Sequence, residues 1–137
     1  MDNISIIPYQ YSKFLFYSSF SMLICAIISI IMNDIYVTLY IFILFLTSIN
    51  HWRRPEYGLR RNIDMFVVKC GVILFFYQVC LLKNEFCRYV SVCMLICSIS
   101  FYIFENILEY FHNLQWIIFH MTIHLYMSLC ILFIIFN

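Results

Sequence analysis

The segments IFILFL (residues 41–46) and ILFIIF (residues 131–136) decide the fold class of this chain. Neither segment alternates apolar and polar residues, as the strands of a transmembrane barrel do. The rest of the 137-residue chain has the same character, since 65% of its residues are hydrophobic, 20% are aromatic and only 11% are charged. Because helices satisfy every backbone hydrogen bond inside lipid, the sequence predicts an all-α, polytopic transmembrane helical bundle.

The few charged clusters divide the apolar sequence into pieces of about 20 residues, the length of helix that crosses the hydrocarbon core. We therefore expect about five spans, which form a single transmembrane domain over residues 1–137. Their approximate ranges are 12–32, 35–51, 63–82, 87–105 and 114–136.

The charge balance limits the classes of partner. Eight basic and seven acidic side chains give a formal net charge of +1. Nucleic-acid binding needs a strongly basic surface, so this class is set aside. Membrane lipids are the partners that the composition predicts, whereas protein partners and the organelle are not indicated.

The distribution of basic residues predicts the orientation of the chain. With five spans, the N-terminal side receives Lys13, Arg53, Arg54, Arg60 and Arg61, whereas the opposite side receives Lys83 and Arg88. Lys and Arg in short loops favour the cytoplasmic side, so this count of five against two predicts a cytosolic N-terminus. The four arginines also have a second interpretation, as a site for a lipid phosphate. Trp52 and Trp116 are expected at the interface of the same side.

A group of polar residues falls at one depth of the predicted membrane. His51 ends the second span and Asp64 begins the third, on the N-terminal side. His120 and His124 enter the fifth span from that side and, being four residues apart, share one helical face. At 1.5 Å of rise per residue, all four lie in the same half of the bilayer. The hydroxyl residues Thr47 and Ser48 precede His51 by about one turn.

These residue types are sufficient for a hydrolytic zinc site. Three neutral imidazoles can hold a zinc ion that keeps one position for water and lowers the pKa of that water to about 7. Asp64 would orient the water or take its proton, and Ser48 or Thr47 would donate a hydrogen bond to the oxyanion. Glu105 and Glu109, at the end of the fourth span, are either carboxylate partners of a ligand histidine or solvated helix-end groups.

The segment TSINH (residues 47–51), Asp64 at the start of the next span and HMTIH (residues 120–124) resemble the pattern of a membrane hydrolase superfamily. This superfamily contains the alkaline ceramidases and the progestin and adipoQ receptors, seven-span proteins with a zinc ion held by three histidines. The resemblance implies that His51, His120 and His124 are the zinc ligands, that Asp64 positions the water and that the hydroxyl of a Ser-x-x-x-His motif assists the carbonyl. This chain would be a shortened form with five spans, in which Thr47 has the four-residue spacing and Ser48 lies three residues from His51.

The sequence therefore predicts an integral membrane, zinc-dependent hydrolase that acts on amide or ester bonds of lipids. Two alternatives stay open. In a non-enzymatic membrane scaffold or subunit, each histidine would bond a buried hydroxyl or carbonyl. In a haem-binding membrane anchor, His51 and either His120 or His124 would be the axial ligands, one from each of two helices.

Overall fold

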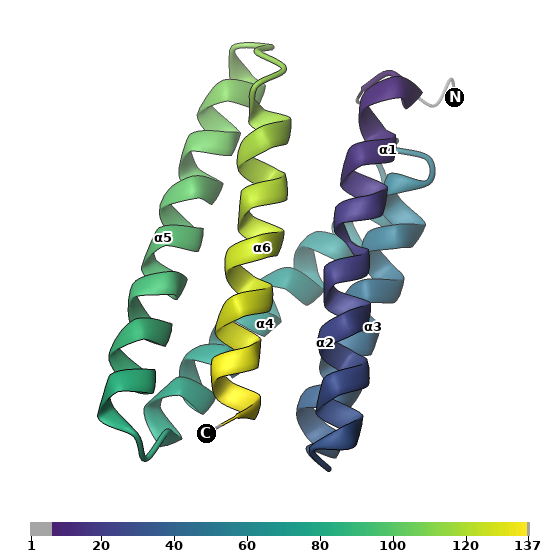
Figure 1. The fold of residues 1–137 in the computed structure, drawn as a ribbon. Helices are drawn as coiled ribbons and strands as arrows, with labels where there is room; N and C mark the ends of the chain where they lie inside the picture. Colours follow the sequence, from purple (N-terminus) through teal and green to yellow (C-terminus); the bar gives the residue numbers. More distant parts are fainter. Residues whose placement is uncertain (1–6, 137) are drawn as a thin grey trace. The chain divides into compact units, whose positions relative to one another are not determined.

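A computed structural model describes residues 7–136. Its helices are α1 (Tyr9–Ser18), α2 (Phe20–Ile31), α3 (Ile35–Trp52), α4 (Leu59–Leu81), α5 (Glu85–Tyr110) and α6 (Trp116–Ile135) (Figure 1). Among residues 7–136, five helical segments are long and apolar enough to cross a membrane, and α1 and α2 together form the first of them. The predicted all-α fold class is confirmed, and the chain is a multi-pass integral membrane protein. The largest difference from the predicted ranges is at the end of the fourth span, which continues to Tyr110.

The first span is divided at a single residue, Ser19, whose backbone keeps helical dihedral angles (φ −62°, ψ −22°). The hydroxyls of Ser18 and Ser19 both donate to the carbonyl of Leu15, at 2.9 Å. Ser21 donates in the same way to the carbonyl of Ser18. Such side-chain bonds to the preceding turn compete with the regular backbone ladder and bend helices, so the serine cluster accounts for the division.

The chain forms two compact units, residues 1–73 and 74–137, which meet inside α4. In the first unit α2 packs along α3, and α1 also contacts α3. The Tyr40 hydroxyl of α3 donates a hydrogen bond to the carbonyl of Val67 in α4. Gly71, one turn further along α4, has no room for a Cβ, because that atom would overlap the Tyr40 ring. Glycine at this position therefore leaves the space that the Tyr40 side chain of α3 occupies against α4.

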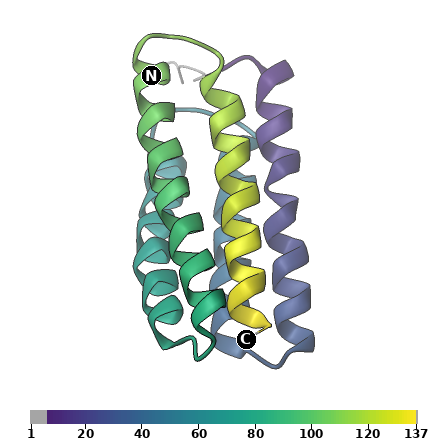
Figure 2. The same ribbon diagram turned by 60° about the vertical axis from the view of Figure 1, so that its left-hand side comes forward.

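In the second unit, α5 and α6 run side by side as an antiparallel hairpin (Figures 1 and 2). The turn begins with His112 in a left-handed conformation, at φ 54°. The amide of His112 donates to the carbonyl of Glu109, and the amide of Asn113 donates to the carbonyl of Leu108. This pair of bonds is a Schellman motif, which ends α5 and turns the chain back toward α6.

Candidate metal centre

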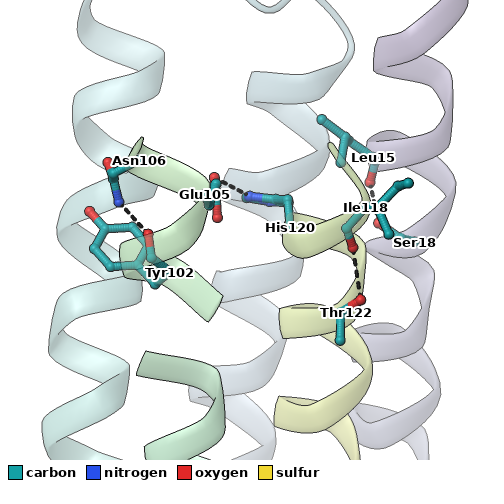
Figure 3. Close-up of polar contacts among 8 residues, drawn as sticks. All are labelled: Leu15, Ser18, Tyr102, Glu105, Asn106, Ile118, His120 and Thr122. Atoms are coloured by element: carbon teal, nitrogen blue, oxygen red, sulfur yellow. Dashed lines mark hydrogen bonds and ion pairs between the residues drawn. The ribbon is translucent and has the colours of Figure 1, made fainter. Parts of the chain in front are cut away.

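The end of α5 and the start of α6 bring a carboxylate against an imidazole (Figure 3). Glu105 Oε1 lies 2.8 Å from His120 Nδ1. The side chains are 10% and 17% exposed, so the contact is largely shielded. An ionised carboxylate only accepts hydrogen bonds, so opposite such a group Nδ1 is the donor. Nε2 is then the nitrogen with which a neutral ring would hold a metal ion, and Glu105 fixes this tautomer.

His124 follows on the same face of α6, as its four-residue spacing predicts. The rings of His120 and His124 have centroids 4.7 Å apart and meet edge to face. Trp116, one turn before His120, lies with its ring 6.3 Å from that imidazole. His124 and Trp116 are both buried. The helix thus presents two neighbouring imidazoles beside a carboxylate of α5.

The first unit buries three of the predicted site residues. Ser48, His51 and Asp64 are 5%, 3% and 4% exposed. His51 is in the last turn of α3, where its ring contacts the ring of Trp52 at a centroid distance of 4.4 Å. Asp64 is in the second turn of α4. Ionisable side chains buried at the ends of spans are costly, so these positions are candidates for a function.

The two candidate hydroxyls, those of Thr47 and Ser48, have different environments. The hydroxyl of Thr47 donates to the carbonyl of Leu44 at 3.1 Å, an ordinary bond to the preceding turn of its own helix. Thr47 is half-buried, whereas Ser48 is buried. Ser48 is therefore the more suitable of the two for a substrate, although its spacing from His51 is three residues.

The predicted site residues divide between the two units. His120 contacts both Glu105 and His124 in one unit, whereas Ser48, His51 and Asp64 belong to the other. The complete ligand set of His51, His120 and His124, with members in both units, stays a prediction. Within either unit, over residues 7–136, no three His, Cys, Asp or Glu side chains are grouped so that they would hold a metal ion.

Sequence reasoning placed Trp52 and Trp116 at the membrane interface without connecting them to the site. The structure buries both, and each lies against a candidate histidine. The sequence indicates this proximity only through spacing, because Trp52 follows His51 directly and Trp116 lies one helical turn before His120. The sequence did indicate Glu105, but only as one of two carboxylates.

Comparison with known proteins found no family model, no curated protein and no solved structure that matches this chain. Its functional assignment consequently rests on its own residues.

Proposed function

We propose that this protein is a multi-pass membrane hydrolase that uses a zinc ion to cleave amide or ester bonds of lipids. The observation that carries the proposal is the 2.8 Å contact between Glu105 Oε1 and His120 Nδ1. Histidines that ligate metals commonly donate their other ring N–H to a carboxylate, which fixes the tautomer and makes the ring a better ligand. A buried carboxylate paired with an imidazole is expensive inside a membrane, which favours a functional reason for the pair.

The ligand set follows from this pair and from the sequence. His124 adds a second imidazole on the same face, with its ring centroid 4.7 Å from that of His120. His51, buried at the end of α3, is the third ligand in the pattern that the sequence resembles. When bound, the zinc ion would supply an activated water for attack on a carbonyl carbon.

The remaining site residues would accept the proton of the attacking water and stabilise the carbonyl oxygen of the lipid substrate. Asp64 is the carboxylate that would accept the proton of the attacking water. Ser48 would donate a hydrogen bond to the oxygen on which negative charge develops. The exposed apolar side chains of the spans would place the protein among the lipids that it is proposed to cleave.

The experiment that tests this proposal combines zinc analysis with a lipid hydrolysis assay on the detergent-purified protein. The wild type should contain about one zinc ion per chain, as a three-histidine site holds a single ion, and should release fatty acid from ceramides or glycerolipids. His124→Ala should lose both zinc and hydrolysis, because two imidazoles hold the ion poorly at neutral pH. Thr122→Ala is the matched control on α6, since its hydroxyl donates to the carbonyl of Ile118 at 2.8 Å (Figure 3).

The Glu105–His120 contact also favours a second function, that of a non-enzymatic membrane subunit in which this pair joins α5 to α6. In that case the wild type would carry no metal and cleave no lipid, while His51→Ala and His124→Ala would stay folded. A haem-binding anchor is the third outcome of the same experiment. A carboxylate-oriented imidazole is a suitable axial ligand, and a Soret band in the absorption spectrum would identify it.

A further inference from the structure

The loop between α3 and α4 concentrates positive charge at one end of two spans. Arg53, Arg54, Arg60 and Arg61 lie within nine residues, and Glu56 is the only acidic residue between them. These four arginines are half of the eight basic side chains of the protein. Since α3 and α4 are both long and apolar enough to cross a membrane, the loop that joins them is expected at the level of the lipid headgroups.

The first turn of α4 carries two guanidinium groups, those of Arg60 and Arg61. Arg60 Nη1 is buried and has no hydrogen-bond partner among residues 7–136. The guanidinium of Arg61 lies over the ring of Tyr57, 5.2 Å from its centroid, which restricts its position. Gly58, at φ +137°, has open space beside its Cα, where an added Cβ would meet no atom within 4 Å. The first turn of α4 contains no acidic side chain, so no carboxylate there neutralises the positive helix end.

We infer that the α3–α4 loop, through Arg60 and Arg61, binds the phosphate headgroup of an anionic membrane lipid. Guanidinium groups bind phosphate oxygens in a bidentate manner, and helix N-termini add backbone donors to such sites. A phosphate oxygen would also give the buried Nη1 of Arg60 the acceptor that a shielded donor requires.

Apolar side chains beside the arginines favour a lipid over free phosphate. Tyr57, Leu59 and Ile63 are all exposed next to the charged groups. They offer contacts to the glycerol and acyl parts of a lipid, which inorganic phosphate lacks. This binding does not depend on the proposed hydrolase, since it involves none of the predicted zinc ligands.

Native mass spectrometry of the full chain in detergent tests the inference. The protein is equilibrated with equal amounts of phosphatidic acid and phosphatidylcholine in the presence of a chelator, so that zinc plays no part. The wild type should retain phosphatidic acid in preference to phosphatidylcholine. The double variant Arg60→Gln with Arg61→Gln should reduce this preference by about fivefold for each arginine, as expected for a guanidinium at an anionic surface. Detergent is chosen because changes to these arginines can alter the orientation of the chain in a membrane.

The matched control is Lys83→Gln with Arg88→Gln, which removes two basic residues at the other end of the spans. Arg88 already lies 3.6 Å from Glu85, so its charge is partly neutralised. This control should keep the wild-type preference. Equal retention of both lipids by the wild type, or an equal loss in the two double variants, would overturn the inference. So would binding of inorganic phosphate as tight as that of phosphatidic acid, since the site would then not be specific for a lipid.

Discussion

Replacing Glu105 shows whether this side chain orients His120 as a metal ligand or only joins α5 to α6. Glu105→Gln keeps the shape of the side chain but removes its negative charge, so His120 should become a weaker metal ligand. We expect zinc affinity to fall by about 10–100-fold, the usual cost of losing a carboxylate behind a ligand histidine. Competition with a chromophoric chelator measures this affinity. Glu85→Gln, an exposed glutamate on the same helix, is the control. Unchanged zinc affinity in Glu105→Gln would mean that the contact only joins two helices.

Single replacements of Ser48 and Thr47 show which of the two hydroxyls assists hydrolysis. Ser48→Ala should lower lipid hydrolysis by about 10²–10³-fold if its hydroxyl stabilises the oxyanion. Thr47→Ala should leave the rate near that of the wild type, because its hydroxyl already bonds the carbonyl of Leu44. Initial rates at saturating lipid, with zinc content measured in parallel, separate a catalytic loss from loss of the metal. A larger rate loss in Thr47→Ala would instead support the four-residue spacing of the resembled motif.

Among the helices, α3 reaches α4 through the Tyr40 side chain, which occupies the space left by the absent side chain of Gly71. Gly71→Ala should destabilise the protein by about 1–3 kcal/mol, since its Cβ would overlap the Tyr40 ring. Unfolding in mixed micelles of increasing SDS content measures this change. In a Tyr40→Leu background the same replacement should cost less, because the overlapping atoms are gone. Equal costs in both backgrounds would show that the added methyl group does not act through the Tyr40 ring.

The helices themselves are predictable from the sequence, because apolar runs of sufficient length have few stable alternatives in lipid. The division at Ser19 is less predictable, since serine occurs in many straight helices and bends one only when its hydroxyl bonds the preceding turn. Similarly, the spacing of His120 and His124 predicts that they share one face of their helix. Which of the two carboxylates, Glu105 or Glu109, contacts His120 depends instead on the register that the α5–α6 turn imposes. Spacing along one helix can be read from a sequence, but the register between two helices requires the structure.

At the scale of the whole molecule, the five spans and the basic residues together determine how the chain crosses the membrane. An odd number of spans puts the two ends of the chain on opposite sides. The α3–α4 loop, with four arginines, should then face the cytosol, and the α4–α5 turn should face the other side. The proposed site requires this arrangement, because its residues come from the end of α3 and the starts of α4 and α6, which would all have to face one side of the membrane.

Labelling with a membrane-impermeant thiol reagent tests this orientation, after the exposed native cysteines are changed to serine. A cysteine in place of Glu56 should be protected in sealed, right-side-out vesicles, and one in place of Lys83 should react. Replacing Arg53, Arg54, Arg60 and Arg61 by glutamine leaves Lys13 against Lys83 and Arg88. Because the exposed Lys69 of α4 can also extend to the side of Lys13, the bias is then removed, and a substantial fraction of the chains should insert with the opposite orientation. If the cysteines at positions 56 and 83 reacted from the same side in the wild type, α4 would not cross the membrane. The common depth of His51, Asp64, His120 and His124 would then be lost, and the zinc site with it.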